Sequence, residues 1–194
     1  MKRFFTSMLM LAILVAPMWA QRVKIGGVNY TTTGNISNSA VTGSVHFDAS
    51  TKVLTLKNAT ITVSDNDAVF VTGFTDGLTI RCEGSNTIIC SASSSSSAGI
   101  YGQSKIWIGS ASGQVGSLTV KNTGVGNAIR MEPNYRLDIS GVRFTAETSQ
   151  NDCVHGMSDN NIFAHNYTWM TLTAPTGKAA MSGFTAIYTS LNGV

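Results

Sequence analysis

Four side chains that could contact a ligand recur at intervals of 25 to 31 residues: Trp107, Asp138, Phe163 and Tyr188. Each is the middle residue of a short triplet that begins with Ile or Leu, as in Ile106-Trp-Ile. Side chains alternate between the two sides of a strand, so the middle residue points away from the core. Aromatic rings can stack on sugar rings, and a carboxylate can accept a hydrogen bond from a sugar hydroxyl. These four residues are therefore the candidate ligand-binding positions.

The competing interpretation is that a loop, a cap or a partner domain covers the rings, because large exposed apolar patches rarely go unused. Two other sets of middle residues offer less. The first set is His46, Phe70, Ile100, Arg130, His155 and Met181, and the second is Thr62, Ile89, Thr119, Arg143 and Thr171. The histidines are too many repeats apart to share a metal, and no zinc-ligand spacing occurs. No metal and no cofactor is predicted.

No catalytic residues are predicted either. Glycoside hydrolysis generally needs two carboxyl groups about 5–9.5 Å apart, and calcium-assisted elimination needs several acidic oxygens around one ion. Asp138 is the one acid among the middle residues. Glu132 and Asp159, at equivalent corners of successive repeats, come nearest to a pair, but corner acids are usually solvated turn residues. With no nucleophile–base arrangement and no phosphate-binding glycine loop, the chain is predicted not to be an enzyme.

The triplets belong to a repeat that covers most of the chain. Each repeat begins at a small residue, and the intervals between the beginnings are 24, 30, 30, 25 and 26 residues. The beginnings are Ser44, Ala68, Ala98, Ala128, Cys153 and Ala179. A fixed period in this range indicates a solenoid, because one repeat cannot bury its own apolar side without neighbours.

Each repeat except the last, which stops before its third run, holds three short runs with apolar residues at every second position. The second run of the first repeat is Leu54-Thr-Leu and the third is Ile61-Thr-Val. Three strands per repeat predict an all-β, single-stranded parallel β-helix over 44–194, with about six coils and the last one incomplete. A sandwich of antiparallel hairpins would not explain why the first, second and third runs each resemble their own kind along the chain.

The N-terminal region reads as a secretory signal peptide over residues 1–20. Lys2-Arg3 precedes an apolar run from Phe4 to Val15, and Ala20 offers a small residue for cleavage. The mature protein is therefore expected to be secreted, outside the cell or on its surface, with the periplasm as the alternative. Residues 21–43 are expected to cap the first coil, because a solenoid needs an atypical end. Nothing after Asn192-Gly193 would cap the last coil, so either the chain is a piece of a longer array or partner contacts cover that end.

The charge of the mature chain narrows the class of partner. Removing Lys2 and Arg3 from the 13 basic residues leaves 11 against 10 acidic ones, a net charge of +1. Without a basic cluster, neither nucleic acid nor an anionic membrane is an expected partner, and the mature chain is not expected to insert into a membrane. No apolar run after Val15 has a period of 3.6 residues, so almost no helix is expected.

Three cysteines leave at least one thiol unpaired in a monomer. Cys153 occupies a position that Ala fills in other repeats, which predicts a buried structural thiol. Cys82 and Cys90 belong to one repeat and could form a disulfide or remain two free buried thiols. The sequence does not decide between these alternatives, because it does not fix their separation.

The cycle of Leu54-Thr-Leu-Lys-Asn-Ala-Thr-Ile, Gly77-Leu-Thr-Ile with Asn86-Thr-Ile, and Gly116-Ser-Leu-Thr-Val resembles secreted bacterial right-handed parallel β-helix proteins. These proteins are pectate-lyase-like in fold, and many are labelled as carbohydrate-binding-domain-containing. The resemblance covers 44–194 and implies the same fold and an extracellular glycan-related role. It carries no catalytic motif, because His155-Gly156 echoes a polygalacturonase signature but lacks the surrounding acids.

The function that these observations favour is a non-catalytic module that binds a polysaccharide or another surface ligand. Its contact residues would be Trp107, Asp138, Phe163 and Tyr188. Two alternatives remain open. The chain could be a structural or adhesin spacer within a longer surface protein, or a partial or degenerate polysaccharide lyase or hydrolase.

Overall fold

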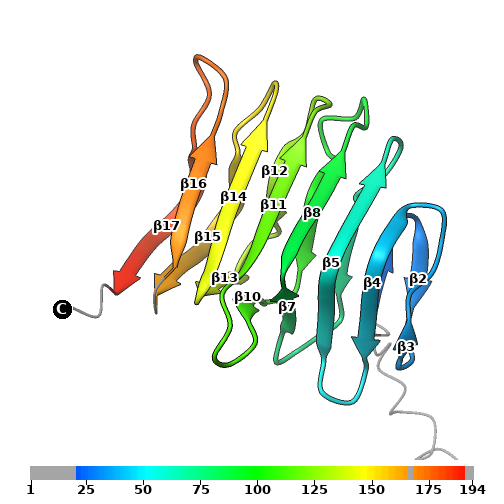
Figure 1. The fold of residues 1–194 in the computed structure, drawn as a ribbon. Coiled ribbons are helices and arrows are strands. Elements are labelled where there is room, and N and C mark those ends of the chain that lie inside the picture. Colours follow the sequence, from blue (N-terminus) through cyan, green and yellow to red (C-terminus); the bar gives the residue numbers. More distant parts are fainter. Residues whose placement is uncertain (1–20, 166–167, 191–194) are drawn as a thin grey trace, which may run out of the picture.

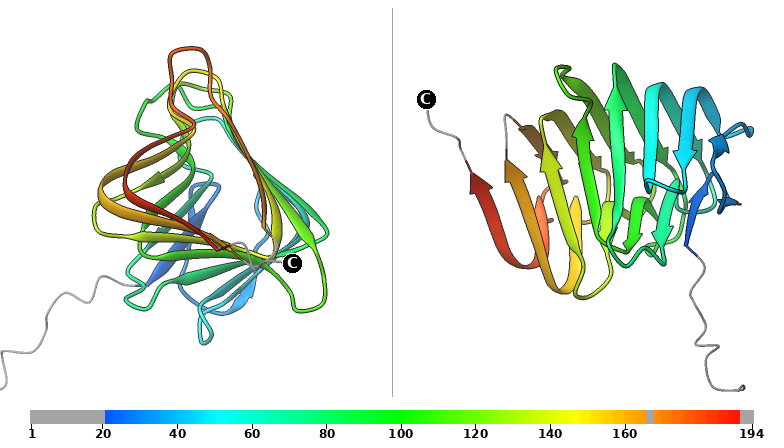
Figure 2. Two further views of the ribbon diagram at one scale, coloured as in Figure 1. Left: turned by 90° about the vertical axis from the view of Figure 1, so that its left-hand side faces the viewer. Right: turned by 90° about the horizontal axis from the view of Figure 1, so that it is seen from below.

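A computed structural model describes residues 21–165 and 168–190, so the predicted signal peptide lies outside the described residues. The described chain consists of strands and turns and contains no helix, which confirms the all-β prediction. It winds into a parallel β-helix of about five turns, with the N-terminal strands at one end and β17 at the other (Figure 1). Seen along the axis, the coils have a three-sided outline (Figure 2). No described helix could span a membrane.

Each side of the coil is a parallel sheet, called here the first, second and third face in chain order. The first face contains β6 (Val69–Thr72), β9 (Ala98–Gln103), β12 (Asn127–Met131) and the beginnings of β15 (Val154–His165) and β17 (Met181–Ser190). The second contains the beginning of β5 (Val53–Val63), β7 (Leu78–Glu83), β10 (Ile106–Ser110), β13 (Arg136–Ser140) and the ends of β15 and β17. The third contains the end of β5, β8 (Ser85–Cys90), β11 (Gly116–Asn122), β14 (Val142–Thr148) and β16 (Trp169–Thr173). The prediction of three strands per coil is confirmed.

The N-terminal end of the solenoid is closed by antiparallel strands: β1 (Arg22–Ile25), β2 (Val28–Tyr30), β3 (Gly34–Asn35) and β4 (Val41–Asp48). β1 pairs antiparallel with β6, and β4 pairs antiparallel with β5. The prediction that Ser44-Val-His-Phe opens the first parallel coil is therefore wrong, and the antiparallel cap extends beyond residue 43. Alternation with a period of two is common to both kinds of pairing, so it could not reveal the direction of β4.

The turn between β4 and β5 explains why the chain reverses there. The Asp48 carboxylate accepts hydrogen bonds from the backbone N–H groups of Ser50 and Thr51 at 2.9 and 3.2 Å, and from the Ser50 hydroxyl at 2.6 Å. These donors hold the pKa of Asp48 well below its ordinary value. Lys52 adopts a φ of 57°, in the left-handed region that tight turns use. The turn makes β4 and β5 a hairpin.

The core lies inside the coil and consists of columns of aliphatic side chains. On the second face, Leu137 and Ile139 stack on Ile106 and Ile108 in the neighbouring coil, and all four are at most 1% exposed. Burying a side chain of this kind contributes about 1.5–3 kcal/mol. The inward positions predicted for β10 and β13 are thus confirmed.

Several strand registers differ from the sequence alignment of the repeats; on the second face, for example, Leu54 lies opposite Ile80 and not Leu78. Two others lie on the third and first faces. On the third face, the sequence grouped Thr119 with Ile89 and Arg143, but Thr119 lies opposite Thr87 and Thr145, and Leu118 beside it lies opposite Asn86 and Phe144. The slip is two residues, so inward side chains stay inward. On the first face, Ile100 is fully buried and the next residue, Tyr101, points outward. Turns of unequal length cause both differences, because they displace a strand relative to the beginning of its repeat.

Buried asparagines satisfy the backbone where the chain turns a corner. Asn86 is 2% exposed; its side-chain NH₂ donates to the carbonyl groups of Glu83 and Ser117, and its oxygen accepts from the Ala59 N–H. Asn122 and Asn160 make comparable bonds in later coils. Unpaired buried peptide groups would cost about 1–3 kcal/mol each, so these side chains stabilise the turns.

All three cysteines are free and buried, which decides the question left open for Cys82 and Cys90. Cys153 is 0% exposed, as its position in the repeat predicted. Burial raises the pKa of the Cys82 thiol to about 12 and that of Cys153 to about 11. Because thiolates are the reactive form, these thiols are expected to be inert in the folded protein.

Candidate functional site

The four predicted ligand-binding residues lie in one column of the second face. Trp107 pairs with Asp138, Asp138 with Phe163, and Phe163 with Tyr188 in the register of β10, β13, β15 and β17. The prediction that these positions share one column is confirmed. The side chains of Phe163 and Tyr188 lie outside the described residues, so their role in binding stays a prediction.

Asp138 does not offer the exposed acceptor that the sequence predicted. Its side chain is 1% exposed, and Arg136 Nη2 lies 2.5 Å from its Oδ1. Arg136 is two residues earlier on the same side of β13, so its guanidinium can fold over the carboxylate. The position in the strand was predicted correctly, but the surface role of Asp138 is wrong because its neighbour covers it.

Trp107 is half-buried, and its ring is already in contact with protein groups. The Lys105 ammonium lies 4.2 Å from the ring centroid. The ring also packs against Gly77 in the preceding coil, where an added Cβ would lie 2.5 Å from Trp107 Cζ3. A sugar that stacks on this ring would compete with these contacts.

The first face carries an outward ladder of long side chains that contact one another. Arg22 Cζ lies 5.9 Å from the Phe70 ring centroid, and the Phe70 and Tyr101 centroids are 5.2 Å apart with an interplanar angle of 32°. Arg130 Cζ lies 5.2 Å from the Tyr101 ring centroid. Each ring therefore has a neighbour on both sides along the axis, which for Phe70 are Arg22 of the cap and Tyr101 of the next coil. This first-face ladder leaves ring edges, rather than ring faces, for a ligand.

The polar end of Tyr101 is also occupied. Its hydroxyl donates a short hydrogen bond to Glu132 Oε1 and accepts one from Gln103 Nε2 at 3.2 Å. Burial and the Glu132 carboxylate raise the pKa of Tyr101. Glu132 was one member of the predicted corner pair, and the side chain of the other, Asp159, lies outside the described residues.

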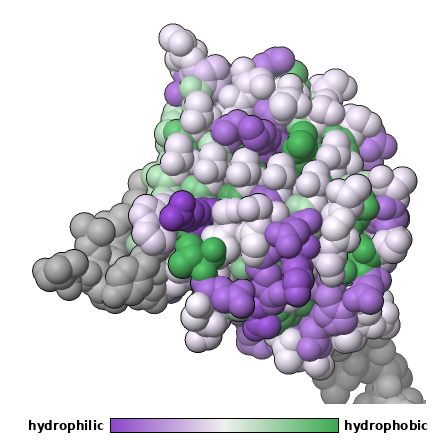
Figure 3. Space-filling model, in the orientation of Figure 1, coloured by the Kyte–Doolittle hydropathy of each residue, from purple (hydrophilic) through white to green (hydrophobic). Residues whose placement is uncertain are grey.

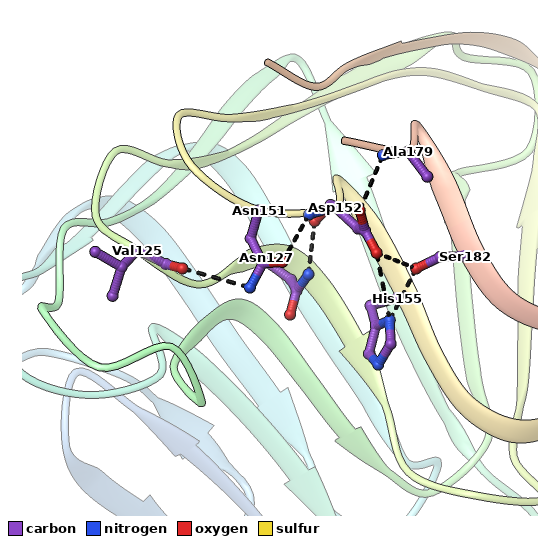
Figure 4. A network of polar contacts seen from close by, with 7 residues as sticks. All are labelled: Val125, Asn127, Asn151, Asp152, His155, Ala179 and Ser182. Atoms are coloured by element: carbon purple, nitrogen blue, oxygen red, sulfur yellow. Dashed lines mark hydrogen bonds and ion pairs between the residues drawn. The ribbon is translucent and has the colours of Figure 1, made fainter. Parts of the chain in front are cut away.

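A polar cluster that the sequence did not reveal links the last two coils on this face (Figure 4). The Ser182 hydroxyl donates to Asp152 Oδ2 at 2.6 Å, and His155 Nδ1 lies 2.8 Å from Ser182 Oγ. The backbone N–H of Ala179 donates to Asp152 Oδ1 at 2.9 Å. The Ser182 hydroxyl and the Ala179 N–H lower the pKa of Asp152, with a smaller contribution from His155. Ser182 follows Asp152 by 30 residues and His155 by 27, about one repeat, which is the spacing that could have indicated their contact.

This cluster does not have the chemistry of an activated serine. The hydroxyl has one proton, and it is directed to the Asp152 carboxylate. His155 Nδ1 can then bond to Ser182 Oγ only as a donor, whereas a general base would have to accept the serine proton. The cluster ties β17 to β15 and does not activate a nucleophile.

The third face, which Figure 1 views directly, carries a column of threonines. Their backbones pair in register from Thr60 to Thr87, Thr119, Thr145 and Thr171. These five residues are called the threonine row. None of their hydroxyls hydrogen-bonds to another group among residues 21–165 and 168–190. The two-residue slip in the sequence alignment concealed this column, because it put Thr62, Ile89 and Arg143 in place of its members.

The surroundings of the threonine row carry little free charge. In the next column of the third face, Lys121 Nζ and Glu147 Oε2 form an ion pair at 2.8 Å. Figure 3 shows this face in the same orientation, with rows of pale residues of intermediate hydropathy across much of it and hydrophilic residues gathered lower in the view. The face is polar mainly through hydroxyl groups.

Trp169 stands at the C-terminal end of the third face and is 53% exposed. Arg143, its partner in the neighbouring strand, places Cζ 5.3 Å from the Trp169 ring centroid. Within the described residues no second ring or cation lies against Trp169. It is two residues from Thr171 on the same side of β16, so ring and hydroxyl are neighbours. The sequence alignment missed Trp169 because it directly precedes the triplet Met170-Thr-Leu.

Searches of family models, of curated proteins and of solved structures find no match to this chain. Within the described residues, no group of three or more His, Cys, Asp or Glu side chains could hold a metal ion. Among the described side chains, the threonine row and the largely exposed ring of Trp169 place groups suited to a ligand together on the third face.

Proposed function

We propose that this protein is a secreted, non-catalytic β-solenoid that binds a glycan on its third face. The observation that carries the proposal is the 53% exposed ring of Trp169, adjacent to Thr171 at the end of a row of unengaged hydroxyls. The site differs from the second-face column that the sequence favoured, where Asp138 is buried and Trp107 is partly covered.

The chemistry of the third face suits a sugar. The apolar side of a sugar ring can pack on the face of an indole, as aromatic side chains do with other apolar groups. Arg143 supports the other side of the indole and fixes its orientation. Threonine hydroxyls both donate and accept, so they can match sugar hydroxyls without a metal or a cofactor. Affinity is expected to be modest, because an open face desolvates little of a ligand.

A structural or adhesin spacer is the second candidate, and the first-face ladder favours it. Arg22, Phe70, Tyr101 and Arg130 contact one another and leave ring edges, rather than ring faces, for a ligand. A protein whose three faces all behaved in this way would serve to hold other domains apart.

Retention on a glycan array by the purified protein and by Trp169→Ala tests the proposal. Trp169→Ala should lose retention on every glycan that the unmodified protein binds, with little change in melting temperature. Tyr135→Ala is the matched control, because Tyr135 is also exposed, at 37%, but lies in the turn before β13. If no glycan is retained, or if Trp169→Ala binds as well as the parent, the proposed site is wrong and the spacer function is favoured.

A further inference from the structure

The direction of the threonine row indicates the shape of the ligand. The row crosses all five strands of the third face, so it runs along the solenoid axis. Neighbouring strands are about 4.8 Å apart, so four steps span about 19 Å. A compact mono- or disaccharide could reach only one or two of these hydroxyls. A linear chain laid along the axis could reach all of them.

The hydroxyls of the row are held in place before any ligand arrives. Threonine is branched at Cβ, so its χ1 angle is restricted, and each backbone segment is fixed by strand pairing on both sides from Thr87 to Thr145. Rigid donors and acceptors lose little conformational entropy on binding. Repeated, weak and preorganised hydrogen bonds favour a ligand that is itself a repeat.

The charges next to the row indicate an uncharged ligand. Lys121 and Glu147 neutralise each other at 2.8 Å, and the row itself has no ionisable group. Arg143 is stacked on Trp169 at the end of the face. A polyanion would find no series of cations along the axis, and a polycation would find no series of carboxylates.

We propose that the ligand of the third face is a neutral, linear polysaccharide that lies along the solenoid axis. Its hydroxyls bond to the threonine row, and one of its sugar rings packs on the side of Trp169 that faces away from Arg143. This inference rests on the proposed glycan-binding function and adds the charge, shape and direction of the ligand. Threonine is also favoured in strands for its own sake, so the test removes hydroxyls and keeps the β-branched shape.

The probes are β-1,4-linked oligomers of glucose, mannose and xylose, two to six units long, and galacturonate oligomers of the same lengths. Titration calorimetry compares the parent protein with the triple variant Thr87→Val, Thr119→Val, Thr145→Val. Thr55→Val, Thr79→Val is the matched control, because both of these threonines are half-buried outward residues of the second face. At least one neutral series should bind about tenfold more tightly at five units than at two. The triple variant should lose that gain, and the control should keep it.

The outcomes separate this inference from the proposed function. If Trp169→Ala abolishes binding but the triple variant binds long oligomers like the parent, the threonine row is not the ligand track and the inference is overturned, while the glycan site stands. Galacturonate oligomers that bind as tightly as the neutral ones would also overturn it. If no oligomer of any length binds the parent, both the inference and the proposed function are overturned.

Discussion

The first and third faces have the same backbone geometry, but the outward side chains of the first contact one another and the threonine hydroxyls of the third do not. On both faces, equivalent residues of neighbouring coils lie about 4.8 Å apart. Long side chains cross that distance, as Arg130 does to reach Tyr101 and as Tyr101 does to reach Glu132. Threonine hydroxyls do not, because a hydrogen bond needs about 2.5–3.0 Å between oxygens. A column of long residues therefore binds itself, and a column of short hydroxyl residues remains available for a ligand.

The second face lies between these extremes. Lys105 reaches the ring of Trp107, and Arg136 covers Asp138, but each contact joins residues only two apart in the chain. Side-chain length thus predicts which outward columns of a parallel solenoid are open for binding better than the presence of aromatic residues does.

The largest expected effects lie in the core that the two faces share. Ile100→Ala behind the first face and Leu118→Ala behind the third should each lower the free energy of unfolding by about 2–5 kcal/mol. Both side chains are 0% exposed. Denaturant melts at fixed temperature measure the loss. If the two variants lose similar stability, the first and third faces differ only in their outward side chains. If Leu118→Ala loses little stability, the third face is not packed on the core as described here.

Removal of a first-face ladder residue should have the next largest effect. Tyr101→Ala deletes the contacts with Phe70 and Arg130 and the hydroxyl bonds to Glu132 and Gln103. A loss of about 1–3 kcal/mol is expected, typical of a point mutation that removes packing and a polar network together. The comparison between the faces fails if the same melts show less than about 0.5 kcal/mol, which is the range of an ordinary surface substitution.

The sequence predicted the coil well because each strand repeats the same alternation. Leu137 and Ile139 could be placed inside from the period of two, and the four candidate residues could be placed in one column from the spacing of the repeats. What it could not predict depends on turn geometry. The tight turn at Asp48 reverses β4, and unequal turns shift Leu118 by two residues against its neighbours. A register shift of two residues leaves the same side chains pointing inward, so the alternation of apolar residues could not reveal it.

The candidate site was harder to predict than the fold, for a different reason. The exposure of an outward residue depends on which neighbour reaches it, as Arg136 reaches Asp138. Trp169 was missed because it lies at the edge of its strand, and the threonine row was missed because its register was wrong. Asp152 and Ser182 are 30 residues apart and meet only once the coils are stacked.

A smaller effect is expected from acid at the Asp152 cluster, at the C-terminal end of the first face. The hydrogen bonds to its carboxylate keep the pKa of Asp152 below its unfolded value. Their contribution to stability is present above the unfolded pKa of about 3.9 and disappears as the pH falls through the lower folded value. Asp152→Asn should therefore weaken the acid dependence of unfolding between about pH 5 and pH 2. The difference should be below about 1 kcal/mol, because the carboxylate is partly in solvent.

Ser182→Ala removes the strongest of these donors and should give a similar, smaller flattening of the same pH profile. Thermal melts across the pH range measure both variants against the parent. An Asp152→Asn profile that runs parallel to that of the parent would mean that the cluster contributes nothing in its charged form.

The sharpest comparison pairs two substitutions that each delete one hydroxyl group, and one of them has the smallest expected effect. Tyr101→Phe removes a first-face hydroxyl with two protein partners, Glu132 and Gln103. Its loss should lower the free energy of unfolding by about 0.5–1.5 kcal/mol. Thr119→Val removes a third-face hydroxyl that bonds to no described protein group and replaces it with a methyl of the same branched shape. It should change stability by less than about 0.5 kcal/mol, because the deleted hydroxyl bonds only to water.

Both variants are measured in the same denaturant melts, with glycan retention recorded in parallel. Tyr101→Phe should leave retention intact, and Thr119→Val should weaken it. Equal losses of stability would show that the threonine hydroxyls are engaged within the folded protein, and the distinction between a self-satisfied face and an open one would not hold.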